Sequence, residues 1–283
     1  MAQRHKRKCV VVNADDFGFS EGVTEGILRA HDEGIVTSTT ITANLPAAAP
    51  AVARLKDAPG LGVGVHLNVS QGPPLSPAGR ALADEDGVMR GTAGAVLAGC
   101  VLHPRRLDAI EAECDAQIRW VLDHGIRPTH LDSHRHIHAF TPVFLRVARL
   151  ARRYDIRFVR WHREVLPGPP WPVRADKQRW VAVLCNVFGL CNAHAATGVR
   201  HADATWGIAH TGRIDEPWLI RAARSVRPGV TEIMTHPGAG EDLDPGETRL
   251  LASRAAEREA LCAPAVREAF RQSGIELIHY GQL

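Results

Sequence analysis

The residues best suited to chemistry lie in one short stretch, His130–His138. Histidine occupies four of its nine positions, whereas the whole chain has 15 histidines in 283 residues; the four are His130, His134, His136 and His138. Neutral imidazole is the commonest protein ligand for an ion such as zinc. A helix would place residues four apart on one face, and a strand would do so for alternate residues, so either could aim two rings at one ion. Asp132 could add a ligand or orient a histidine.

Ionisable residues also stand near the ends of other predicted strands. Along the chain they are Asp15, Asp16, His66, Arg160, Asp203 and His236. The carboxyl ends of parallel strands meet at one rim, where barrel enzymes carry their active sites. Any one of these residues could be structural, as a helix cap, a core histidine or half of an ion pair. Six segments, counting the one with His134, deliver an ionisable side chain to this rim, which indicates a shared site.

Two histidines and one carboxylate leave positions open on a metal ion for water and substrate. Such an ion lowers the pKa of bound water and polarises a carbonyl oxygen. A second carboxylate can accept the proton of the water, and a histidine can protonate a leaving amine. Asp15 and Asp16 are adjacent, which suits one ligand and one base. Non-haem iron oxygenases use a similar ligand set, but they usually have antiparallel β folds.

The elements that must position these residues alternate in type. Apolar, β-branched runs predict strands at Cys9–Asn13, Ile35–Ala43, Leu61–Leu67, Thr129–Asp132, Ile156–Arg160, Val199–Thr205, Val230–Thr235 and Ile275–His279. Helical segments separate them, and this order predicts a parallel sheet with right-handed crossovers. The length favours an α/β fold of the (β/α)-barrel type, distorted or incomplete, with seven to eight parallel strands. A doubly wound open sheet is the alternative.

Helix signals support this order at several points. Ser20 is a predicted N-cap for a helix that runs to Asp32. Thr141–Pro142 gives a second helix start. Residues Glu247–Gln272 are expected to form a long helix that Pro264 kinks or splits. Residues 80–100 are read as an insertion with partial helix.

The length allows one large domain or two small ones, and the order of elements favours one catalytic barrel domain over residues 9–283 after a disordered basic tail, residues 1–8. The net charge is +3, and four cations in the first eight residues account for it, so the rest is nearly neutral. A nucleic-acid enzyme usually carries a basic face, and none is expected. No segment reaches the roughly 18 apolar residues of a membrane span. Six scattered cysteines without a Cys-x-x-Cys pair indicate reduced thiols and a cytoplasmic protein.

Five motifs together resemble the YdjC/ChbG-type carbohydrate deacetylases, which include the diacetylchitobiose deacetylases. In chain order the motifs are Asn13–Gly18, Val36–Thr40, Gly64–Asn68, Thr129–His138 and Thr235–Gly238. They span most of the chain, and the first and fourth are the most specific. The resemblance implies a distorted barrel related to polysaccharide deacetylases, a divalent metal ion and hydrolysis of an N-acetyl group from an amino sugar.

The resemblance also implies roles for individual residues. Asp16, His66 and His134 would bind the metal, Asp15 would be the general base, and His236 would be the acid. One divalent ion is expected, Mg²⁺ or Zn²⁺, with Ni²⁺ or Co²⁺ also compatible. Arg160, at the end of its strand, is grouped with the catalytic candidates.

Substrate contacts are expected mainly between residues 161 and 206, where the resemblance weakens. Tryptophan offers an apolar face to a sugar ring, or it packs the loops. The candidates for substrate contact are Trp161, Trp171, Trp206, Asp203 and His138. The partner would be a small carbohydrate, free or within a glycoconjugate, and a homodimer is compatible with the sequence.

Two other functions fit parts of the pattern. Another barrel metallohydrolase, such as a phosphoesterase or a cyclic amidohydrolase, would need a dinuclear site, for which His136, His138 and Asp132 could supply ligands. A non-catalytic sugar-binding protein could keep the same fold. Such a protein would need neither Asp15 nor His236.

Overall fold

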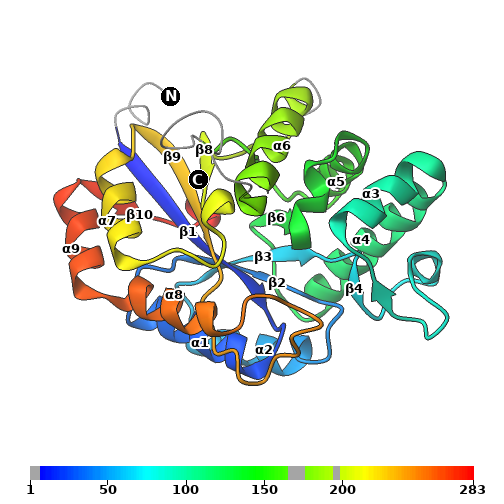
Figure 1. The fold of residues 1–283 in the computed structure, drawn as a ribbon, viewed down its shortest axis with the longest axis horizontal. Helices are drawn as coiled ribbons and strands as arrows, with labels where there is room; N and C mark the ends of the chain where they lie inside the picture. The colour runs from blue at the N-terminus through cyan, green and yellow to red at the C-terminus, as the bar shows by residue number, and fades with distance from the viewer. Residues whose placement is uncertain (1–6, 165–175, 194–197) are drawn as a thin grey trace.

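The computed structural model describes residues 7–164, 176–193 and 198–283. Its centre is one sheet of eight parallel strands surrounded by helices (Figure 1). The strands are β1 (Lys8–Phe17), β2 (Ser38–Ile41), β3 (Gly62–Leu67), β6 (His130–Ser133), β7 (Phe158–Val159), β8 (Ala204–Trp206), β9 (Gly229–Thr235) and β10 (Ile275–Leu277). A separate antiparallel pair, β4 (Gln71–Gly72) and β5 (Met89–Arg90), lies in the predicted insertion.

The main sheet follows the order β7-β6-β3-β2-β1-β9-β8, and β10 pairs with the start of β1. Read from β1, the path continues through β2, β3, β6 and β7, and then returns through β8 and β9. A single parallel bridge between Phe158 and Arg200 links β7 to the segment before β8. The sheet therefore curls into a distorted barrel, and the predicted α/β fold is confirmed.

Strand β1 is the central strand because it has neighbours on both sides along most of its length. It pairs with β9 from Lys8 to Ala14 and with β2 from Asn13 onward. Val10, Val11 and Val12 are fully buried, as expected of a strand covered on both faces. The pairing with β2 shifts register between Ala14 and Phe17, so the two aspartates sit in an irregular strand end.

Nine α-helices of the described residues cover this sheet. They are α1 (Glu21–Asp32), α2 (Ala48–Arg54), α3 (Ala93–Leu102), α4 (Arg106–Asp123), α5 (Thr141–Arg153), α6 (Lys177–Asn192), α7 (Glu216–Ser225), α8 (Ala252–Cys262) and α9 (Pro264–Gln272). Ser20 accepts a hydrogen bond from the Val23 amide and caps α1, as predicted. Pro264 separates α8 from α9, which confirms the predicted break, but α8 begins only at Ala252.

Other boundaries differ from the expectations. Lys8 opens β1 and so belongs to the sheet, while residues 1–6 lie outside the described residues. The strand expected over Ile35–Ala43 is only Ser38–Ile41, and the strand expected over Ile156–Arg160 is only Phe158–Val159. β-branched residues therefore extended the predictions into loops that flank the strands, because tertiary pairing decides where a ladder ends.

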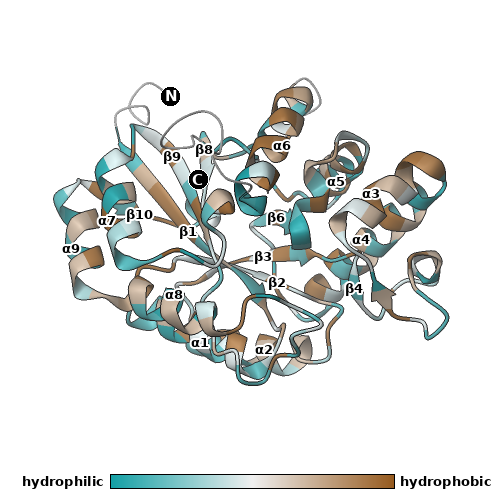
Figure 2. Cartoon of the chain, viewed as in Figure 1, coloured by the Kyte–Doolittle hydropathy of each residue, from teal (hydrophilic) through white to brown (hydrophobic). Residues whose placement is uncertain are grey.

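Helices α3 and α6 contain many hydrophobic residues (Figure 2), and several of them are exposed. On α6, about half or more of the surface of four large hydrophobic side chains is exposed: Trp180, Leu184, Val187 and Leu190. In the ranges that the structure describes, no helix is long and apolar enough to cross a membrane.

Gly26 tests the packing of α1 against the loop that follows β9. A Cβ atom there would lie 2.4 Å from the Gly238 Cα, which is backbone and cannot swing away. Gly26→Ala should therefore lower the free energy of unfolding by about 1–3 kcal/mol, as overpacking does. Urea unfolding would measure it.

Gly94 is the matched control because it also lies in a helix but faces open space. The nearest atom to a Cβ there is 4.0 Å away. Gly94→Ala should raise the unfolding free energy by about 0.5–1 kcal/mol, the usual gain from alanine in a helix. Equal effects of the two substitutions would contradict the assigned contact.

Candidate active site

A cavity of about 420 Å³ opens at the carboxyl ends of the strands. Its lining includes Asp15, Asp16, His66, His134, His136 and His236. These residues come from the ends of β1, β3 and β9 and from the 3-10 turn after β6, His134–Ala139. The structure therefore brings together all five residues to which the family resemblance gave a role in catalysis or metal binding.

Asp16 faces two imidazole rings. Its Oδ1 atom lies 3.3 Å from His66 Nε2 and 3.3 Å from His134 Nδ1. The three candidate ligand atoms lie within 4.8 Å of one another. Asp16 Oδ1 is buried and has no hydrogen-bond partner among the described residues. A buried carboxylate oxygen aimed between two ring nitrogens fits a divalent ion with two nitrogen ligands and one oxygen ligand.

Three non-glycine residues in or next to this cluster adopt a left-handed backbone conformation. Asp16 has a φ angle of 75°, and Arg135 and His136 have φ angles of 57° and 56°. Non-glycine residues rarely adopt this region, and where they do the strain concentrates at functional sites. Here it turns Asp16 at the end of β1 and bends the chain directly after His134.

His66 is oriented from behind by Asp132. The His66 Nδ1 and Asp132 Oδ1 atoms are 2.8 Å apart, and the Thr40 hydroxyl donates to Asp132 Oδ2 at 3.1 Å. A carboxylate behind a ligating histidine fixes the ring and leaves Nε2 for the ion. Burial alone would lower the pKa of His66, but Asp132 and the two rim aspartates outweigh it and raise the pKa to about 9. Ion binding would therefore displace a proton from this ring.

Asp15 has different surroundings from its neighbour. Arg160 forms a bidentate ion pair with Asp15, in which Nη1 lies 2.7 Å from Oδ2 and Nη2 lies 2.6 Å from Oδ1. Asn13 also donates to Asp15 Oδ1 at 2.9 Å. Burial would raise the pKa of Asp15, but the guanidinium outweighs burial and holds the pKa below its ordinary value. Asp15 is therefore an ionised carboxylate on the cavity wall.

Arg160 lies behind the cavity wall. It is fully buried, and besides Asp15 it contacts Asp132 at 2.9 Å and Glu232 at 2.7 Å. Tyr280 donates to the other oxygen of Glu232 at 2.7 Å. Since Arg160 does not line the cavity, the geometry gives it a positioning part, acting through Asp15 and Asp132.

His236 follows β9 on the cavity wall. Its backbone N–H donates to Glu257 at 2.8 Å, and its Nδ1 atom is buried without a hydrogen-bond partner in the described part of the chain. Burial lowers the pKa of His236 to about 4, although Asp15 and Asp16 act in the opposite sense. The ring is therefore neutral at pH 7 in the free protein, and it needs a proton before it can act as an acid.

Four of the residues expected to contact substrate do not line the cavity: Trp161, His138, Trp206 and Asp203. Trp161 is buried, stacked on His201 with 4.5 Å between ring centroids. His138 is fully buried, with its two ring nitrogens near the Ser133 hydroxyl and the Arg160 carbonyl oxygen, at 2.5 Å and 3.1 Å. Trp206 ends β8 but does not line the cavity. Trp171 lies outside the described residues.

The placement expected for Asp203 is wrong. It precedes β8 instead of ending it, and its Oδ2 atom accepts from the Val230 amide at 2.8 Å. Val230 stands near the start of β9, so Asp203 lies at the end of the barrel opposite the rim. The predicted strand, Val199–Thr205, began too early, which moved this residue to the wrong end.

Three cations share the cavity that were not among the residues predicted for the site. Arg135, Lys177 and Arg249 line it, together with one additional acid, Glu247. Lys177 opens α6, and Arg249 lies in the segment before α8. Neither position follows a strand, so the rule that identified the other residues could not find them. Arg135 stands inside the histidine cluster, the only one of the three with a local signal.

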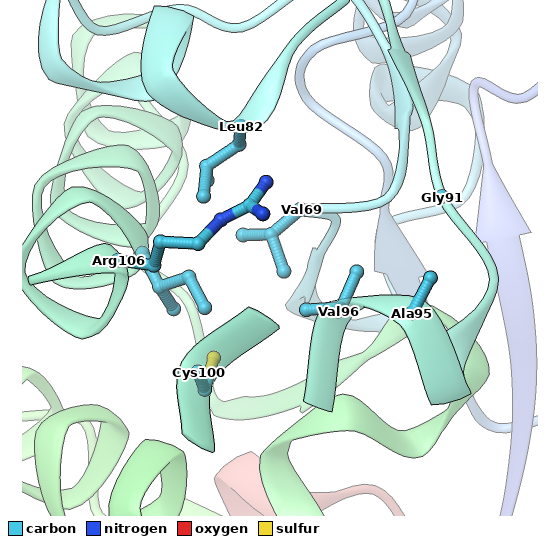
Figure 3. Close-up of a pocket in the computed structure, with 8 residues that line it drawn as sticks. Val69, Leu82, Gly91, Ala95, Val96, Cys100 and Arg106 are labelled. Carbon is cyan, nitrogen blue, oxygen red and sulfur yellow. The ribbon is translucent and has the colours of Figure 1, made fainter. Parts of the chain in front are cut away.

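A second, smaller cavity lies between α3, α4 and the segment around Leu82. Its volume is about 90 Å³, and the Arg106 side chain extends into it toward Leu82 and Val69 (Figure 3). Its other lining residues are mostly apolar, with Cys100 among them. This space is too small for a sugar ring with its substituents, so the larger cavity is the candidate site.

Asp132→Asn tests the orientation of His66. The amide keeps the shape of the side chain but loses the charge that faces His66 and Arg160. We expect the affinity for Zn²⁺, measured by titration calorimetry, to fall by about 10- to 100-fold. Asp115→Asn is the control, since Asp115 is also buried but pairs with Arg153 on the helical layer. Unchanged affinity in Asp132→Asn would show that His66 needs no such support.

Comparison with known proteins places the chain in a family. Residues 9–272 match the YdjC-like protein family. A carbohydrate deacetylase of Brevibacillus brevis is 30% identical over 97% of this chain and 99% of its own length. A carbohydrate deacetylase of Halalkalibacterium halodurans is 43% identical, over 52% of this chain and 61% of its own length. One of Geobacillus stearothermophilus is 44% identical over 56% of this chain and 63% of its own length.

One solved structure has a similar fold over nearly the whole chain. A protein of Enterococcus faecalis V583, described as a cellobiose-phosphate cleavage protein, superposes with a TM-score of 0.77 at 25% identity. The alignment covers 98% of this chain and 99% of that one. Fold, motif order and sequence similarity agree, and the chain belongs to the YdjC-like family.

Proposed function

We propose that this protein is a metal-dependent hydrolase that removes the N-acetyl group from an N-acetylated amino sugar and releases acetate. One observation carries the proposal: the two adjacent carboxylates, Asp15 and Asp16, have different partners. Arg160 contacts both oxygens of Asp15. Arg254 contacts only one oxygen of Asp16, and the other oxygen faces two histidine nitrogens. The free oxygen of Asp16 suits a metal ligand, and the ionised Asp15 beside it suits a proton acceptor. The relatives described as carbohydrate deacetylases support the same chemistry.

Each role follows from the position of the residue. Asp16, His66 and His134 would hold the ion, which when bound supplies Lewis acidity toward a carbonyl oxygen and toward water. Asp15, ionised and held by Arg160, accepts the proton of the attacking water. His236 stands on the same wall and, once protonated, donates to the leaving amine. Asp15 and Asp16 favour the protonated ring, which offsets part of the effect of burial.

The donor set bears on the identity of the ion. Two imidazoles and one carboxylate favour a transition metal such as Zn²⁺, Ni²⁺ or Co²⁺ over Mg²⁺, which prefers oxygen ligands. A dinuclear metallohydrolase is less compatible with the site. The second group of close donors is Asp15, His66 and Asp132, and both of its carboxylates already contact the buried cation Arg160. An ion there would repel the guanidinium.

The cavity size suits a mono- or disaccharide unit, such as an end of a chitooligosaccharide. Its volume of about 420 Å³ is in the usual range of small-molecule sites. A phosphorylated amino sugar is a second candidate. The cations Arg135, Lys177 and Arg249 line the cavity, and the Enterococcus faecalis neighbour is described by a sugar phosphate. The six cysteines are free thiols, which favours a reducing, cytoplasmic location.

Acetate release tests the reaction directly. The metal-loaded enzyme should release acetate from N-acetylglucosamine, from N,N′-diacetylchitobiose or from their phosphorylated forms, and a chelator should abolish the release. Re-addition of Zn²⁺ or Co²⁺ should restore it. Absence of acetate from the whole panel would exclude these simple sugars as substrates. Phosphate release without acetate would instead support a phosphoesterase.

Substitution of each aspartate separates base from ligand. Asp15→Asn should leave the ion bound and lower the rate by roughly 10²- to 10⁴-fold, the usual contribution of positioned proton transfer. That loss corresponds to about 3–5.5 kcal/mol in the barrier. Asp16→Asn should lower metal content and activity together.

Metal content and thermal unfolding should be measured on the same preparations, because Asp15→Asn also removes a partner of Arg160. Arg160 keeps Asp132 and Glu232 in that variant. An Asp15→Asn enzyme with normal turnover, or with as little metal as Asp16→Asn, would contradict the two roles.

A further inference from the structure

Helix α8 directs two charged side chains into the protein interior. Arg254 and Glu257 are each only 1% exposed, three residues apart on the face that also buries Ala260 and Leu261. The helix, orange in Figure 1, packs beside α1. A buried charge is costly unless it is paired, so the partners of these two residues show what the helix does.

Arg254 contacts the candidate metal ligand Asp16. Its Nη2 atom lies 2.6 Å from Asp16 Oδ2, the oxygen that does not face the histidines. The guanidinium carbon also lies 5.7 Å from the centre of the Phe19 ring. Asp16 sits in a strained, left-handed conformation at an irregular strand end. Arg254 therefore holds one oxygen of Asp16, so that only Oδ1 points at His66 and His134.

The same guanidinium holds the segment before α8. Arg254 Nε donates to the Leu250 carbonyl oxygen at 3.1 Å. Leu250 is the last residue of the stretch 245–250, all of which lines the cavity. One side chain thus connects the candidate metal ligand to the loop that a substrate would meet.

Glu257 acts on the other side of the cavity. Its Oε1 atom accepts the backbone N–H of His236 at 2.8 Å, at the end of β9. Arg254 also accepts the Gly238 amide through its own carbonyl, at 3.3 Å. The first turns of α8 are therefore bonded both to Asp16 and to the segment that presents His236.

We propose that Arg254 is a positioning residue that makes Asp16 a one-oxygen metal ligand and couples it to the loop 245–250. The inference rests on the proposed function, since it concerns the ion that Asp16, His66 and His134 would hold. Arg254 uses two different nitrogens: Nη2 orients the carboxylate of Asp16, and Nε holds the loop through the carbonyl oxygen of Leu250. A merely structural arginine would stabilise the fold without affecting either property.

Arg254→Met and Arg254→Lys separate the two contacts. Arg254→Met removes both, so the affinity of the folded protein for Co²⁺ should fall by about 10- to 100-fold, as for other groups that orient a ligand. Arg254→Lys keeps a cation for Asp16 but lacks the separate Nε–H group that donates to the Leu250 carbonyl oxygen. Its Co²⁺ affinity should stay within about threefold of the wild type, while its KM should rise severalfold.

The visible absorption of bound Co²⁺ gives a readout that does not depend on activity. Once its second oxygen is released, Asp16 can bind through both oxygens, which raises the coordination number and weakens the absorption in Arg254→Met. Arg271→Met is the control, because Arg271 is an exposed arginine that pairs only with Glu268 in the described structure. It should match the wild type in affinity, spectrum and KM.

Several outcomes would overturn the inference. Removing a cation beside an ion should tighten binding if charge alone matters, so unchanged or tighter Co²⁺ binding in Arg254→Met would refute the positioning role. Equal losses in the methionine and lysine variants would also refute it. If Arg254→Met does not fold, the lysine variant still decides, since wild-type KM would exclude the coupling to the loop. Failure of the wild type to bind Co²⁺ would instead count against the proposed function.

Discussion

The site depends on the ion pairs that the buried cation Arg160 forms with three carboxylates. Its guanidinium contacts Asp15 from β1, Asp132 from β6 and Glu232 from β9, and each of these carboxylates is at most 1% exposed. No one of these carboxylates could be buried as an anion without a partner, because desolvation of an unpaired charge costs far more than a fold can spare. Three strands therefore meet around one side chain, and the barrel interior carries the charge that catalysis at the rim requires.

This arrangement gives the two adjacent aspartates different properties. Arg160 takes both oxygens of Asp15, whereas Arg254 takes a single oxygen of Asp16 and leaves the other facing two histidines. The strained backbone at Asp16 turns the side chains apart. Two arginines from distant parts of the chain thus give different surroundings to the proposed base and the proposed ligand, where local sequence provides two identical groups.

The residues with a rim position were predictable for one physical reason. In a parallel barrel the end of a strand fixes the location of the next residue, and a strand can be recognised from its β-branched run. Asp15, Asp16, His66, His134 and His236 all follow this rule, and the structure gathers them on one cavity. Trp161 and Asp203 show its limit. Trp161 comes just after β7 yet is buried against His201. The predicted start of β8, Val199, lies before the observed start, Ala204, so Asp203 was assigned to the wrong end of the strand.

The sequence by itself determined the alternation of strands and helices, the parallel sheet and the residues that could bind an ion, because these depend on local pattern and on strand direction. Tertiary structure alone decided which partner each charge receives. Arg254 lies more than 200 residues from Asp16, and Glu257 lies about 20 residues from His236. The local sequence does not distinguish them from Arg258 and Glu259 of the same helix, which are more exposed. Long-range pairing of buried charges depends on how helices pack against the barrel, and that packing is a property of the folded chain.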